Sequence, residues 1–91
     1  MDYDQQYLLA DVQVGKHATG LVILHSEFVF VTGLIGARIW SGLSSGLTIN
    51  AISTEIAADF DVTDVRARQD IRAFVDELER RALVIRRSSK P

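Results

Sequence analysis

The sequence predicts an α+β fold in which a three-stranded antiparallel sheet is followed by three helices. Two runs rich in β-branched and aromatic residues, 21–25 and 28–32, lie close together in the first half of the chain. In the second half, apolar residues recur at helical spacing. A length of 91 residues suits one small domain with one hydrophobic core, so we expect a single domain over 1–91.

The strands are expected over 11–14, 21–25 and 28–32. Residues 11–14 alternate polar and apolar side chains, which is typical of a half-buried strand, and the glycine-flanked segment 15–20 is expected to end it. Ser26 and Glu27 form the turn of a hairpin. The run Phe-Val-Phe-Val at 28–31 needs cover on both faces. Either this strand is fully buried, or its edge is open to pairing with another chain.

The first helix is expected from about 35 to 43, because Ser44, Ser45 and Gly46 stop it. Thr48 and Thr63 are suitable N-caps for helices over 49–60 and from 64 to about 81. We expect one core containing Ile39, Trp40, Ile56, Phe60 and Leu78. The third helix has an apolar stripe made of Ala67, Ile71, Phe74, Leu78 and Ala82, which Val75 widens.

A short extended piece is expected near 82–85, after the third helix. The ordered core then covers about 8–85, and the tails are 1–7 and 86–91.

The charges are unevenly distributed. Residues 1–60 hold six acidic and two basic side chains, whereas residues 61–91 hold six acidic and eight basic ones, and the net charge is −2. An acidic partner would therefore be attracted only to the last third of the chain. No apolar run is long enough to span a membrane, and the acidic N-terminus lacks the basic start of a signal peptide, so a cytoplasmic location is expected.

The sequence offers little catalytic chemistry. Its two histidines, His17 and His25, are expected to be solvated loop or turn residues, although a base made of His25 and Glu27 is conceivable. There are no cysteines, no nucleophile-elbow motif and no phosphate-binding loop; the glycine at 36 is expected to permit close helix packing. We therefore expect no catalytic residues, no metal and no cofactor, and the protein is not expected to be an enzyme.

The order of several motifs resembles the PqqD family over about residues 8–85. These motifs are a strand hairpin, Gly-Ala-Arg-Ile-Trp at 36–40, Gly-Leu-Thr at 46–48, a helix ending in Ala-Ala-Asp-Phe-Asp-Val at 57–62, and Phe-Val-Asp-Glu-Leu at 74–78 before Ala-Leu-Val at 82–84. Each motif alone is weak, but their order and spacing together are specific.

The resemblance implies a small, non-catalytic winged helix-turn-helix domain that binds the leader of a ribosomally made precursor peptide. The leader would add as a strand to the third strand, against the third helix, and would be presented to a leader protease, a cyclase or a radical enzyme. A lasso-peptide pathway is our first choice, with pyrroloquinoline quinone synthesis as the other. The expected peptide-binding residues are Glu27, Phe28, Val29, Phe30, Val31, Thr32, Arg68, Ile71, Arg72, Val75 and Leu78.

Two departures from the family pattern concern the hairpin. The family commonly has a longer, glycine-containing turn and a Leu-Asn pair where this chain has Ser26–Glu27 and Thr32–Gly33. A shift of one residue in the register of 21–32 would exchange the side chains that face the peptide.

The alternative function is a winged-helix DNA-binding regulator. Arg66, Arg68 and Arg72 favour it, whereas the mixed charges of the third helix and the acidic net charge argue against it. A homodimer that pairs its own edge strands is a third alternative. We expect a monomer or weak dimer that binds neither nucleic acid nor a membrane.

Overall fold

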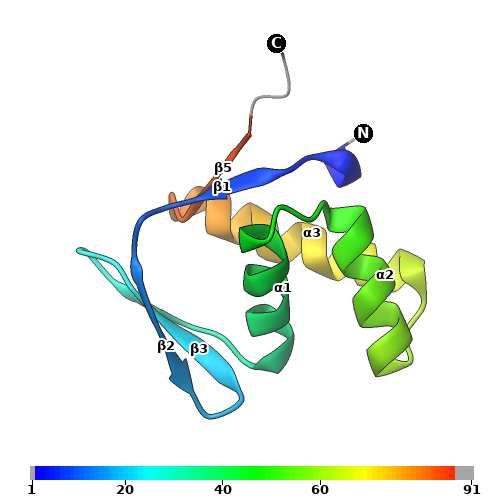
Figure 1. Ribbon diagram of the computed structural model, residues 1–91, viewed down its shortest axis with the longest axis horizontal. Coiled ribbons are helices and arrows are strands. Elements are labelled where there is room, and N and C mark those ends of the chain that lie inside the picture. The colour runs from blue at the N-terminus through cyan, green and yellow to red at the C-terminus, as the bar shows by residue number, and fades with distance from the viewer. Residues whose placement is uncertain (1, 88–91) are drawn as a thin grey trace.

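A computed structural model describes residues 2–87 (Figure 1). Its elements in chain order are the 3-10 helix η1 (Asp2–Asp4), β1 (Tyr7–Leu9), β2 (Gln13–His17), β3 (Gly20–Leu24), β4 (Val29–Val31), α1 (Leu34–Ser44), α2 (Ile49–Phe60), α3 (Asp64–Arg80) and β5 (Val84–Arg86). The expected α+β fold with a small antiparallel sheet and three helices is confirmed. The order differs in part, because the sheet and the helices lie between two further strands, β1 and β5.

The three-stranded sheet has the order β2-β3-β4, and both of its strand pairs are antiparallel. The first strand was expected at 11–14 but occupies Gln13–His17. The glycines at 15 and 20 do not end it, because pairing with β3 continues to His17 opposite Gly20, across a turn in which Ala18 has a φ of 54°. Gly20 is required here, since a Cβ atom at this position would lie 1.8 Å from the Thr32 carbonyl oxygen.

The register of the β3–β4 hairpin is fixed by the pairing of Ile23 with Phe30 and of Leu24 with Val29. Ile23 is completely buried, and a residue directly opposite another on a neighbouring strand shares its face. Phe30 therefore points towards the helices, and so does Phe28, two residues earlier. Val29 and Val31 point away and are more than half exposed.

A second, two-stranded sheet joins the two ends of the described chain. β1 and β5 are antiparallel, with Tyr7 opposite Arg86 and Leu9 opposite Val84, and they lie side by side above the helices in Figure 1. Residues 1–7 and 86–91 were expected to be tails, yet Tyr7 is buried and Arg86 is in a strand. The pairing is reinforced by the Gln5 side chain, which donates a hydrogen bond of 2.8 Å to the Arg87 carbonyl oxygen. The remaining part of the expected C-terminal tail, 88–91, lies outside the described residues.

The helix boundaries follow the expected caps. The hydroxyl oxygens of Thr48 and Thr63 each accept a hydrogen bond of 3.1 Å from a backbone N–H three residues later. The third helix ends at Arg80, so Ala82 does not continue its apolar stripe. Instead Ala82 is exposed, with a φ of 58°, and the turn that it makes directs the fully buried Leu83 into the core.

The expected core is confirmed. Ile39, Trp40, Ile56 and Leu78 belong to one buried cluster, and Phe60 packs against it while remaining partly exposed. None of the three helices within residues 2–87 has the length and apolarity needed to cross a membrane.

We predict that Trp40→Ala lowers the free energy of unfolding by about 3–5 kcal/mol, the usual range for deletion of a buried large aromatic side chain. Urea unfolding followed by circular dichroism measures this loss without relying on tryptophan fluorescence. The control is Val65→Ala on α3, because Val65 is 56% exposed and its truncation is expected to change stability by no more than about 0.5 kcal/mol. Equal unfolding midpoints for both variants would place Trp40 outside the core.

Candidate functional site

β4 is an edge strand with one open side. It pairs only with β3 among the described strands. The Phe28 carbonyl oxygen accepts from the N–H of His25, directly after β3, at 3.0 Å, and the Thr32 N–H donates to Leu21 of β3 at 2.8 Å. Because backbone groups of an antiparallel strand alternate in direction, the N–H and C=O groups of Val29 and Val31 point to the open side. The strand therefore presents four backbone groups to an added strand.

The helix-facing side of β4 meets one flank of α3. The rings of Phe30 and Phe74 lie 6.0 Å apart and are tilted by 57°. The Arg81 guanidinium, directly after the helix, lies 5.2 Å from the ring centre of Phe30 and 5.5 Å from that of Phe28. Phe28 also stacks on His25, with ring centres 4.3 Å apart.

Glu77 completes this group, because its carboxylate accepts hydrogen bonds from Arg80 and, at 2.6 Å, from Arg81. These two arginines lower the pKa of Glu77, so the carboxylate is ionised at neutral pH. One negative charge thus faces two positive charges at the end of α3. We call the set Phe28, Phe30, Phe74, Glu77 and Arg81 the β4–α3 surface.

Gly36 of α1 helps to position Phe74. A Cβ atom at this glycine would lie 3.1 Å from the Phe74 ring and 2.8 Å from the Thr32 Cβ atom, so α1 packs directly on both. The expectation that this glycine permits close packing is confirmed. Beyond Phe74, an apolar hollow of about 290 Å³ lies between the three helices, with Ile35 and Phe60 among its lining residues.

The expected strand residues differ in accessibility. Val29 and Val31 are 57% and 56% exposed, and Phe28 and Phe30 are half-buried. Glu27 is exposed, and its N–H donates to His25 Nδ1. Thr32 is buried, and its hydroxyl accepts from the Leu21 N–H and donates to the Gly33 carbonyl oxygen. Thr32 therefore holds the end of β4 in place and offers no free side-chain group.

Three expected helix residues, Ile71, Val75 and Leu78, lie in the core. No more than 1% of any of them is exposed. They were expected to contact a bound peptide, but at this exposure they have no surface to offer to one. Replacing Val75 with a charged residue would destabilise the core, so it would not report on peptide binding.

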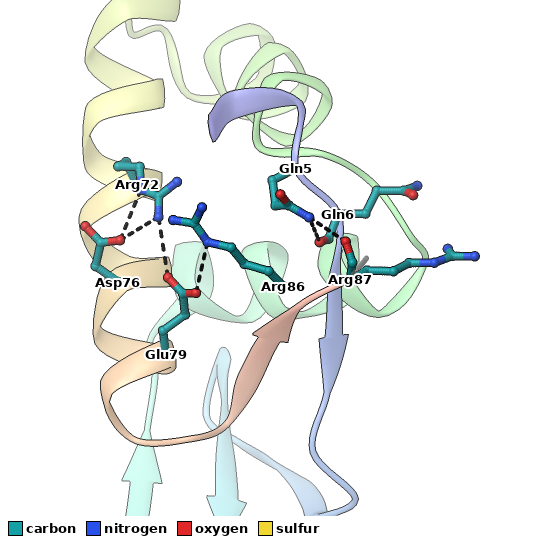
Figure 2. Close-up of polar contacts among 7 residues, drawn as sticks. All are labelled: Gln5, Gln6, Arg72, Asp76, Glu79, Arg86 and Arg87. Atoms are coloured by element: carbon teal, nitrogen blue, oxygen red, sulfur yellow. Dashed lines mark hydrogen bonds and ion pairs between the residues drawn. The ribbon is translucent and has the colours of Figure 1, made fainter. Parts of the chain in front are cut away.

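Arg68 and Arg72 lie on the opposite flank of α3 from Phe74 and Arg81. The Arg68 guanidinium is 5.8 Å from the centre of the Tyr3 ring. Arg72 donates to Asp76 at 2.7 Å and contacts Glu79, which also accepts from Arg86 of β5 (Figure 2). Burial raises the pKa of Tyr7 in β1, next to Arg72. This flank holds β1 and β5 against α3, so it does not share a surface with β4.

Three residues that the sequence analysis did not select, Phe74, Glu77 and Arg81, lie beside β4 in the structure. The sequence analysis placed Phe74 in the apolar stripe and treated Glu77 and Arg81 only as part of the mixed charges of the third helix. In a helix, positions three, four and seven apart share a face, so 74, 77 and 81 form one row. Arg68 and Arg72 form another row, on the far side of the core residues. Because the apolar stripe is wide, the sequence does not indicate which of these two rows faces the sheet.

Among residues 2–87, the histidines do not form a catalytic arrangement with a nucleophile. His25 accepts a backbone N–H at 3.1 Å and stacks on Phe28, and His17 is exposed in β2. Within residues 2–87, no three potential metal ligands lie close enough to share an ion.

Two solved structures resemble this fold. The chain is 28% identical to the protein in "TbiB1 in Complex with the TbiA(beta) Leader Peptide", with a TM-score of 0.77, over 84% of this chain and 92% of that chain. For "Lasso peptide synthetase B1 complexed with the leader peptide", the identity is 20% and the TM-score is 0.80, over 88% of this chain and 98% of that chain. The second likeness shows the fold alone.

No curated protein sequence matches this chain. Residues 20–84, however, match the family described as coenzyme PQQ synthesis protein D (PqqD). The matched segment begins at β3, contains β4 and all three helices, and ends at the first residue of β5. Since it covers most of the sequence, the protein belongs to the PqqD family.

Proposed function

We propose that this protein binds the leader segment of a ribosomally made precursor peptide by strand addition to β4. The observation that carries the proposal is the open edge of β4 beside the β4–α3 surface, in a chain 28% identical to a protein solved with a leader peptide. The bound leader would be presented to a modifying enzyme, namely a leader protease, a cyclase or a radical enzyme. The protein itself would not be a catalyst.

In the proposed binding mode, both backbone hydrogen bonds and apolar side-chain contacts contribute to leader affinity. Val29 and Val31 offer their N–H and C=O groups, and each net hydrogen bond contributes about 0.5–1.5 kcal/mol. So few bonds cannot supply both affinity and selectivity, because association also costs rotational and translational freedom. Apolar contacts with Phe28, Phe30 and Phe74 would supply the rest.

The proposed architecture is a single winged helix-turn-helix domain over residues 1–91. Helices α2 and α3, joined through 61–63, form the helix-turn-helix, and the β2-β3-β4 sheet forms the wing. Among the pathways expected for PqqD-family proteins, we propose a lasso-peptide pathway, with pyrroloquinoline quinone synthesis as the alternative.

Binding to DNA is not supported by the charges of α3. Arg66 pairs with Asp70 at 3.1 Å, Arg72 pairs with Asp76 at 2.7 Å, and Arg80 pairs with Glu77. A helix that binds phosphates presents a continuous basic stripe. Here each of these arginines has an acidic neighbour on the same helix.

We predict that Val31→Pro weakens leader binding by about tenfold, because proline removes an N–H that points to the open side of β4. The N–H of Thr32, which bonds to β3, remains. Fluorescence anisotropy with a labelled synthetic peptide, covering the leader encoded in the same gene cluster, measures the affinity.

Val14→Pro is the matched control for this substitution. By the same alternation, the Val14 N–H points away from β3, on the opposite edge of the sheet. Both variants are expected to melt within a few degrees of each other. If Val14→Pro weakens binding and Val31→Pro does not, the leader adds to β2 and the proposal for β4 fails.

We predict that leader affinity falls less than about tenfold between 50 and 500 mM NaCl, since few charges are expected to meet the peptide. A protein that contacts six to ten phosphates would lose about 10³–10⁵ in affinity between 50 and 200 mM. The same titration with a random 20-base-pair duplex serves as the comparison. Tight, steeply salt-dependent binding of the duplex would favour the DNA-binding alternative.

We predict that the purified protein leaves a full-length precursor peptide unchanged in mass after prolonged incubation, because the described residues contain no activated nucleophile. Mass spectrometry detects either cleavage or loss of water on ring closure. The same incubation with the partner protease added shows that the substrate is competent. Turnover by the protein alone that persists in the His17→Ala variant but is lost in His25→Ala would identify a catalytic His25.

A further inference from the structure

We propose that Arg81 receives an acidic side chain of the bound leader, and that this contact selects among leaders. The inference rests on the proposed binding of a leader strand to β4. It assigns one chemical requirement to the peptide: an aspartate or glutamate on the side of the added strand that faces α3, opposite Phe28 or Phe30.

The first argument is the position of the guanidinium. Arg81 lies over both aromatic rings of the β4 edge, 5.2 Å from Phe30 and 5.5 Å from Phe28. These rings and the bond from Arg81 Nε to Glu77 hold the side chain in one orientation. An arginine that is already ordered loses less conformational entropy when it binds a carboxylate.

The second argument is the local charge. Glu77 is shared between Arg80 and Arg81, so this group of three side chains keeps an excess of one positive charge. Arg81 uses Nε for Glu77, which leaves its two terminal amino groups for a second acceptor. The Arg81 side chain is 41% exposed, so an incoming carboxylate can reach it. The pair of terminal amino groups matches the two oxygens of a carboxylate.

The third argument is the reach of an added strand. Since Val29 and Val31 provide the outward backbone groups, an antiparallel peptide places a non-hydrogen-bonded residue directly opposite Phe30. In such pairs the Cα atoms are about 4.5 Å apart and the side chains are closest. A carboxylate at that position extends over the Phe30 ring, where the Arg81 guanidinium lies.

The test is a double-mutant cycle between the protein and the peptide. The probe is the labelled synthetic leader from the same gene cluster, together with peptides in which each Asp or Glu in turn is replaced by Asn or Gln. We expect Arg81→Gln to weaken binding of the unchanged peptide about fivefold. We expect one amide-substituted peptide to bind Arg81→Gln and the parent protein equally well.

Arg80→Gln is the matched control. Arg80 pairs with the same Glu77 but is 67% exposed and lies over neither ring, so leader affinity should not change. Glu77→Gln removes the anion that competes for Arg81, and we expect it to tighten binding about twofold to threefold. If the Glu77–Arg81 pair had only a structural role, Glu77→Gln and Arg81→Gln would both weaken leader binding.

Two outcomes overturn the inference and leave the proposed function intact. One is that Arg81→Gln binds the leader as tightly as the parent while Val31→Pro still weakens it. The other is that Arg81→Gln weakens every amide-substituted peptide equally, which would indicate a contact with an aromatic ring or the backbone. If the parent protein does not bind the leader at all, the proposed function itself fails.

Discussion

The structure depends on how one helix is buried. Helix α3 buries a narrow row of side chains and leaves a flank on each side of it; the row consists of Ala67, Ile71, Val75 and Leu78. An α-helix cannot bring both flanks to the same neighbour, because they lie on opposite sides of its axis. One flank therefore packs against β1 and β5, and the other packs against β4. This division separates the residues that hold the chain ends together from those beside the open strand.

The two flanks are polar in different ways. On the side of β1 and β5, Arg72 lies between Asp76 and Glu79, and its own side chain is only 16% exposed. Such a partly buried, multiply bonded arginine is part of the packing. On the side of β4, the charges of Arg80, Arg81 and Glu77 are more exposed and unequal in number. An excess of positive charge beside the open edge of β4 is suited to a partner that carries a negative charge.

Much of the fold could be predicted from local signals. The threonines at 48 and 63 fix where two helices begin, and the β-branched runs fix β3 and β4. β1 and β5 could not be predicted as a pair. Each has three residues, too few to show an alternating pattern. Each is a strand only because it pairs with the other, which lies at the far end of the chain. The extent of β2 was missed because glycines in a strand look the same in sequence as glycines in a turn.

The candidate site was predictable on the strand but not on the helix. A strand has only two faces, so Ile23 opposite Phe30 settles which side chains face inwards. A helix presents its residues at all angles, and a stripe containing Ala67, Phe74 and Val75 spans too wide an arc to separate core from flank. The arginines selected from the sequence, Arg68 and Arg72, lie on the opposite flank of that stripe from β4. Arg81 is distinguished by its two aromatic neighbours, Phe28 and Phe30, which come from a segment more than 50 residues earlier in the chain.

The pairing of β1 with β5 also has a consequence for rearranging the chain. Tyr7 and Arg86 lie directly opposite each other, so a short linker can join the two ends without crossing the surface of the domain. The turn at Ala18 and Thr19 is exposed and lies at the tip of the β2–β3 hairpin, outside the paired residues of β3 and β4. A circular permutant opened at this turn would keep β3, β4 and α3 in their native order along one uninterrupted segment. In such a protein, fused partners would emerge from the β2–β3 turn and no longer from the β1–β5 end of the molecule.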